Sequence, residues 1–135
     1  MQNLMKDLTI TLEDRPGTLA KAAEAIAKAG INVEGATGVP RNGKGEFHVL
    51  TKDPTAARRA LEAAGFKVET EQPVLVADVE DKPGAGAEIF RRIADANVNV
   101  TLFYLGTNNR IVIGADNIQK ATEALSKQPT AATRR

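Results

Sequence analysis

The residue types that could do chemistry occur in two similar short stretches. Residues 13–17 are Glu-Asp-Arg-Pro-Gly, and residues 80–84 are Glu-Asp-Lys-Pro-Gly. Asp begins a turn, Pro presets a dihedral angle, and Gly lets the backbone bend tightly and lets a small ligand approach it. A helix is expected to follow, and amides at a helix N-terminus attract a carboxylate. With Asp as acceptor for an ammonium group, each stretch can bind a free α-amino acid, although a purely structural turn fits the pattern equally well.

The residue types give little indication of metal binding, redox chemistry or catalysis. The absence of Cys excludes disulfides, iron–sulfur clusters, thiolate zinc sites and cysteine nucleophiles. The one histidine, His48, falls in a predicted strand with no nucleophile nearby, which is typical of a surface or satisfied core residue. Glu13 and Asp14 are adjacent, so they point to opposite faces and do not converge as an acid–base pair. We therefore expect a protein without catalytic activity, metal or cofactor.

The amino-acid composition argues against nucleic acid and membranes as binding partners. The 135 residues are 42% hydrophobic, and 18 Lys and Arg against 17 Asp and Glu leave a net charge of +1. This balance gives no bulk attraction to nucleic acid or anionic lipid. An RNA-binding strand at 44–51 would need stacking aromatic residues where Glu46, His48 and Thr51 stand. The chain shows neither a signal peptide nor an apolar run long enough for a membrane. We expect a cytoplasmic protein that binds neither nucleic acid nor membranes.

The two turns belong to a longer repeat. Residues 8–33 align without a gap with residues 75–100, at the offset of 67 that separates Asp14 from Asp81. The acidic turn and an apolar-Asn-Val stretch both match in this register, which chance does not easily produce. The duplication predicts one domain at residues 1–72 and a second at 73–127, with a disordered tail at 128–135.

Hydrophobic periodicity and turn residues predict the elements that position these turns. In the first half we expect strands at 8–12, 31–37, 46–51 and 66–70, a loop at 40–45, and helices from Pro16 to Gly30 and over 53–64. In the second half we expect strands at 74–79, 98–105 and 110–113 and helices at 83–96 and 117–125. This order predicts an α+β fold of two tandem ferredoxin-like βαββαβ units, the second lacking its last strand, with antiparallel sheets and helices on one face.

The motifs resemble the ACT domain family. The stretch 13–19 followed by Ala-Gly-Ile-Asn-Val at 29–33 looks like the start of one ACT domain, and residues 80–84 with 97–100 look like a second. The likeness covers residues 4–126 and suggests a stand-alone protein of two tandem ACT domains. It implies a non-catalytic regulatory protein that binds a small ligand, an amino acid, where two ACT units pair. The site residues that it implies are Asp14, Arg15, Pro16, Gly17 and Asn32 in the first repeat, and Asp81, Pro83, Gly84 and Asn99 in the second.

Departures from the family pattern limit what the ligand and the site can be. Serine-binding members often carry His two residues before the turn acid, where this chain has Leu12 and Val79, so serine is disfavoured. Gly86 replaces Leu19 in the second repeat, which favours the Asp14 turn, with Asn99 of a neighbouring unit, as the working site over the mirror arrangement of the Asp81–Gly84 turn with Asn32. The alternative is a ligand-free oligomerisation module acting on a partner enzyme. A homodimer is expected in either case.

Overall fold

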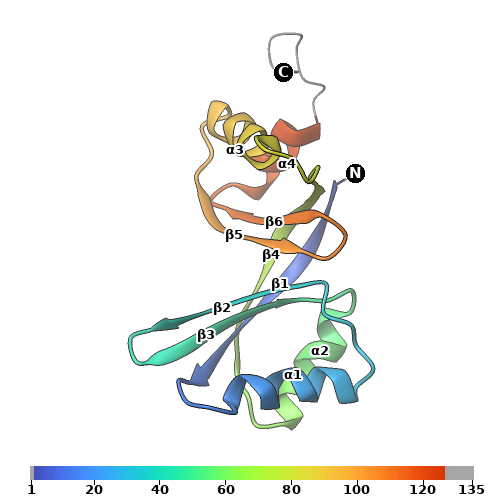
Figure 1. The fold of residues 1–135 in the computed structure, drawn as a ribbon, viewed down its shortest axis with the longest axis vertical. Coiled ribbons are helices and arrows are strands. Elements are labelled where there is room, and N and C mark those ends of the chain that lie inside the picture. Colours follow the sequence, from blue (N-terminus) through green and yellow to red (C-terminus); the bar gives the residue numbers. More distant parts are fainter. Residues whose placement is uncertain (1, 127–135) are drawn as a thin grey trace. The chain divides into compact units, whose positions relative to one another are not determined.

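The computed structural model describes residues 2–126 (Figure 1), so the tail expected at 128–135 lies outside the described residues. The chain forms two compact units. The N-terminal unit is Met5–Gln72, and the C-terminal unit joins the described residues before Met5 to those from Pro73 onward. Within residues 2–126, no helix has the length and apolar character needed to cross a membrane.

The N-terminal unit is built around the strand β3. Its elements are β1 (Gln2–Glu13), α1 (Thr18–Lys28), β2 (Gly35–Arg41), β3 (Lys44–Leu50), α2 (Pro54–Ala63) and β4 (Val68–Asp78). The strand β3 pairs antiparallel with both β1 and β2, so that Phe47 lies opposite Ile10 on one side and Gly38 on the other. The strands β1 and β4 cross the unit boundaries, and each supplies residues to both units.

Alternation along the strands creates the core of this unit. Every second residue of β1 and β3 points to the face on which α1 and α2 pack, and Figure 1 shows both helices on the same side of this sheet. Burial of the apolar faces is the main stabilising term. The buried core residues of the sheet and helices are Leu8, Ile10, Leu12, Phe47 and Val49 with Ala22, Ile26, Ala57 and Leu61.

The C-terminal unit repeats this plan. After β4 come α3 (Ala85–Asp95), β5 (Val100–Gly106), β6 (Arg110–Ala115) and α4 (Ile118–Ser126). The strand β6 pairs antiparallel with β4 and β5. Leu75, Ile93, Ile111 and Ile113 are fully or almost fully buried in its core. The antiparallel sheets and the four helices predicted from the sequence are confirmed, and α4 is the last element among the described residues.

The prediction of β2 and its loop was wrong. The strand was expected at 31–37 but lies at Gly35–Arg41, and the loop expected at 40–45 is a two-residue turn at Asn42 and Gly43. Both turn residues have positive φ, 53° and 79°, as a type I′ hairpin requires. The tight turn draws both flanking strands toward it and moves β2 by about four residues.

Two further boundaries differ from the prediction. The helices expected from Pro16 and from residue 83 begin at Thr18 and Ala85, because Gly17 and Gly84 before them are left-handed, with φ of 94° and 88°. The strands expected at 66–70 and 74–79 are one strand, β4, with Pro73 inside it. The described pairing of β4 with β6 begins at Leu75, so the missing N–H of the proline interrupts none of these pairs.

Candidate ligand pocket beside the first turn

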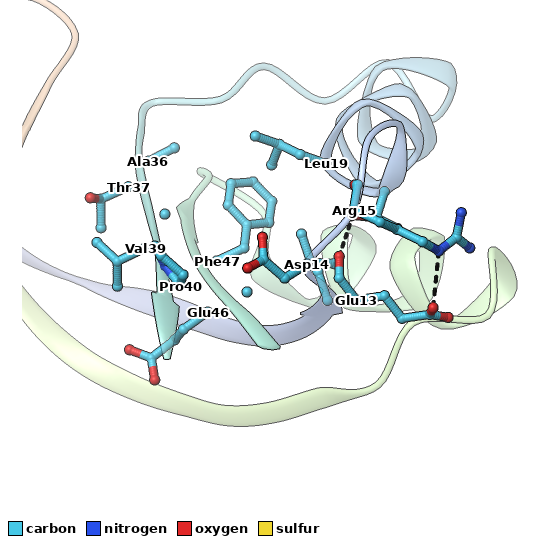
Figure 2. A pocket seen from close by; sticks show the side chains of 14 residues that line it. Glu13, Asp14, Arg15, Leu19, Ala36, Thr37, Val39, Pro40, Glu46 and Phe47 are labelled. Atoms are coloured by element: carbon cyan, nitrogen blue, oxygen red, sulfur yellow. Dashed lines mark hydrogen bonds and ion pairs between the residues drawn. The ribbon is translucent and has the colours of Figure 1, made fainter. Parts of the chain in front are cut away.

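A pocket of about 360 Å³ opens beside the first acidic turn, within the N-terminal unit (Figure 2). It lies between the end of β1, the turn, the first turn of α1 and the hairpin of β2 and β3. The residues that line it are Leu12, Glu13, Asp14, Arg15, Thr18, Leu19, Ala36, Thr37, Gly38, Val39, Pro40, Gly45, Glu46 and Phe47. Two predicted site residues, Asp14 and Arg15, are therefore part of the pocket wall.

Local hydrogen bonds fix the turn. The amide of Arg15 donates to the carbonyl of Glu13 at 3.0 Å, and Thr18 Oγ1 donates to the same carbonyl at 2.6 Å. Gly17 occupies the N-cap position of α1 and has no side chain with which to cap the helix. The first-turn amides of α1 thus lack a side-chain cap; the amide of Thr18 donates to the carbonyl of Arg15 at 3.4 Å, and the amides that follow it can donate to an anionic group. The second turn has the same backbone bond, from Lys82 N–H to the carbonyl of Glu80 at 3.0 Å.

The charged residues of the first turn point in different directions. Arg15 Nε donates to Glu13 Oε2 at 2.9 Å, and both side chains turn away from the pocket (Figure 2). The hydrogen bond from Arg15, with its positive charge, holds the pKa of Glu13 below its ordinary value of 4.5. Asp14 instead points toward β2, and within residues 2–126 its carboxylate has no hydrogen bond or ion pair. Asp14 is therefore an acceptor open to a ligand.

An apolar wall faces Asp14. Phe47 lies on the pocket side of β3, and Leu19 contributes from α1 with 52% of its surface exposed. Beside Phe47, β2 carries Ala36, Gly38 and Pro40 on the same face, and Ala36 and Gly38 pair with Val49 and Phe47. The pocket thus combines one carboxylate, an uncapped helix start and apolar walls, a combination suited to a small zwitterion with an apolar part.

The remaining predicted site residues lie apart from the pocket lining. Pro16 and Gly17 shape the turn without lining the pocket. Asn32 precedes β2 by three residues and donates from Nδ2 to Glu34 Oε2 at 2.9 Å. In the C-terminal unit Asn99 lies directly before β5, and its amide donates to Asp116 Oδ1 at 3.1 Å. Asp81, Pro83 and Gly84 form the turn before α3.

The sequence pattern did not indicate the pocket walls formed by β2 and Phe47, and it indicated Leu19 only as a residue that distinguishes the first turn from the second. These residues meet the turn only through the register of the β2–β3 hairpin and the packing of α1, which no local pattern shows. The Asn-Gly pair at 42 and 43 is the signal that would have placed the hairpin correctly, since it favours a two-residue turn.

Of the two roles expected for His48, a surface residue or a satisfied core residue, the structure shows the second. Its side chain is 8% exposed, and its two ring nitrogens lie 2.8 Å from Asp7 Oδ2 and 2.8 Å from Glu46 Oε2. Thr9 Oγ1 is 3.2 Å from Nδ1. The ring is therefore occupied by a buried polar network, and residues 2–126 contain no cluster of His, Asp and Glu suited to holding a metal ion.

The chain is similar to a family of known proteins and to several solved structures. The family described as "ACT domain pair" matches residues 3–130. The crystal structure of protein BT0572 from Bacteroides thetaiotaomicron is similar at 27% identity and a TM-score of 0.83, covering 93% of this chain and 88% of that one. No curated protein matches the chain.

Two regulatory subunits share the fold at lower identity. The regulatory subunit of aspartate kinase from Thermus thermophilus, in its ligand-free form, is 19% identical with a TM-score of 0.66, covering 92% of this chain and 95% of that one. The corresponding subunit from Thermus flavus is 19% identical with a TM-score of 0.61, covering 93% and 94%. At this identity the likeness concerns the fold alone.

Proposed function

The chain belongs to the family of ACT domain pairs, and on that premise we propose that it is a non-catalytic regulatory protein that binds an amino acid. The observation that carries the proposal is the pocket beside Asp14, in which an open carboxylate and an uncapped helix start lie next to an apolar wall. The shared fold with proteins named as regulatory subunits of aspartate kinase supports a regulatory role.

The binding mode follows from the charges. The ammonium group of the ligand donates to Asp14, and its carboxylate takes backbone amides at the start of α1. The ligand side chain lies against the apolar wall of Leu19 and Phe47. As a further contact we propose Asn99 of a neighbouring ACT unit, in a homodimer or a larger assembly. Arg15, which pairs with Glu13, acts by holding the turn in place.

Isothermal titration of the full chain with each of the twenty amino acids tests this proposal. We expect at least one to bind and Asp14→Ala to weaken its binding about tenfold, since a charged hydrogen bond contributes about 1.5–3 kcal/mol and tenfold corresponds to about 1.4 kcal/mol. Asp14→Asn isolates the effect of the charge, because the amide keeps an acceptor. Asp81→Ala is the matched control in the second turn. Equal affinity of wild type and both alanine variants would remove the ligand from the turns.

The alternative is a ligand-free module that assembles chains and acts on a partner enzyme. It is favoured by the exposure of Phe103 and Leu105, whose surfaces are 57% and 69% exposed. No binding heat with any amino acid at millimolar concentration, together with a stable oligomer in analytical ultracentrifugation, would favour this alternative.

A further inference from the structure

The duplication allows each pocket wall to be compared with its counterpart. The offset of 67 places Phe103 and Leu105 of β5 at the positions of Ala36 and Gly38 of β2. The strand registers agree with this correspondence, because Ala36 and Gly38 lie opposite core residues of β3, and Phe103 and Leu105 lie opposite core residues of β6. The opposing residues are Val49 and Phe47 in the first hairpin and Ile113 and Ile111 in the second. All four strand positions therefore face the helix-covered side of their sheet.

The helices α1 and α3 also differ in that the second unit has the larger side chain. Ala23 of α1 corresponds to Phe90 of α3. In the C-terminal unit, the rings of Phe90 and Phe103 pack edge to face, with centroids 5.0 Å apart and an interplanar angle of 67°. In the N-terminal unit both members of this pair are alanine. The second unit thus has two packed aromatic rings at positions where the first has two methyl groups, and one of these methyl groups, that of Ala36, lines the pocket.

We propose that the ligand is an amino acid with a large apolar side chain, which occupies the space over Ala36 and Gly38, where the C-terminal unit carries the side chains of Phe103 and Leu105. The inference rests on the proposed function, in which an amino acid binds beside Asp14. It also assigns one binding site to each chain, in the N-terminal unit. In the C-terminal unit, the side chain of Phe103 lies at the position that we assign to the side chain of the ligand in the N-terminal unit.

The chemistry of the pocket selects such a ligand. Leu12, Leu19 and Phe47 offer apolar surface that a leucine- or phenylalanine-sized side chain can cover. A charged side chain would lose its hydration there without gaining a partner, because Glu46 at the rim is already paired with Arg41 at 3.1 Å and with His48 at 2.8 Å. Alanine or serine would leave the wall in contact with water. The volume of about 360 Å³ lies within the range of about 300–1,000 Å³ found for small-molecule sites.

Calorimetric titration with leucine, phenylalanine, alanine, serine and lysine tests the proposal. We expect leucine or phenylalanine to bind at one per chain, at least tenfold more tightly than alanine, serine or lysine. Ala36→Phe should weaken the binding of the large apolar ligand at least tenfold. Phe103→Ala, the matched change in the other unit, should leave that affinity within about twofold.

If Ala36→Phe does not fold, the milder variant Gly38→Ala tests the same part of the pocket. In Gly38→Ala the added Cβ meets only the carbonyl oxygen of Glu46, at 3.7 Å, so the fold has room for it. We expect a severalfold weaker binding of the large ligand and little change for alanine. Thermal unfolding without ligand verifies that each variant is folded.

The outcomes separate this inference from the proposed function. Tighter binding of a small or charged amino acid, two sites per chain, or unchanged affinity in both Ala36→Phe and Gly38→Ala would overturn the inference and leave amino-acid binding intact. Loss of binding in Phe103→Ala alone would place the ligand in the C-terminal unit and overturn it as well. Absence of binding by every amino acid would overturn both.

Discussion

Each ring nitrogen of His48 faces a carboxylate oxygen, with Nδ1 2.8 Å from Asp7 Oδ2 and Nε2 2.8 Å from Glu46 Oε2. A neutral imidazole carries one N–H, so it can donate to only one of the two carboxylates. Burial lowers the pKa of His48, but the hydrogen bonds and charges of Asp7 and Glu46 outweigh it and raise the pKa above its ordinary value of 6.5. The neighbouring polar groups are Thr9 Oγ1, Gln72, which donates to Asp7 at 3.4 Å, and Arg41, paired with Glu46. The folded chain therefore favours the charged ring.

This arrangement predicts a pH-dependent stability. Because the pKa of His48 is raised on folding, its contribution to the free energy of unfolding is complete below about pH 6.5 and is lost as the pH rises through the higher folded value. Urea unfolding should therefore give a falling free energy of unfolding above pH 6.5. His48→Gln should abolish that fall, since the chain contains no second histidine. A free energy that rises over this range, or an unchanged slope in His48→Gln, would contradict the prediction.

For the helices, strands and turns, the sequence predicts the features that neighbouring residues determine. It misses the features that depend on the pairing of strands. The acidic turn was predictable because Asp, Pro and Gly act on their own backbone. The strand β2 was misplaced because it contains Gly38 and Pro40, which are poor strand residues, and exists through its pairing with β3. More than half of the residues that line the pocket come from the β2–β3 hairpin and depend on its register. The turn side of the site was therefore predictable and the β2 side was not.

The left-handed backbone of the glycine before α1 can be tested by substitution. Gly17 has φ of 94°, and a Cβ added there would meet nothing within 4 Å, so the whole effect of Gly17→Ala comes from backbone strain. We expect a loss of about 1–2 kcal/mol in the free energy of unfolding, measured by urea titration. Gly38→Ala is the matched control, because this glycine does not have positive φ and its added Cβ is accommodated. Equal effects of the two substitutions would show that the left-handed backbone of Gly17 is not the cause.

For the whole molecule, the duplication was evident in the sequence because the two acidic turns and the two apolar-Asn-Val stretches keep one offset. The way the chain divides was harder to predict. Strand β1 begins before Met5 and β4 continues past Gln72, so two strands supply residues to both units. Periodicity describes each strand locally and cannot show that one strand serves two cores. Pro73 made β4 look like two separate strands.

The shared strands predict that the chain unfolds as one cooperative system. Ile26 and Ile93 are equivalent in the repeat and fully buried, one in each core. Ile26→Ala and Ile93→Ala should each lower the free energy of unfolding by about 2–5 kcal/mol, and the matched Ile→Val variants by about 0.5–1.5 kcal/mol. Since β4 continues without a break from Val68 in one core to Leu75 in the other, unfolding of one unit should loosen this strand in the other unit. Each alanine variant should therefore shift a single transition that calorimetry and circular dichroism report alike. Two separate transitions, with each variant moving only one of them, would show that the units unfold independently and that β1 and β4 do not couple them.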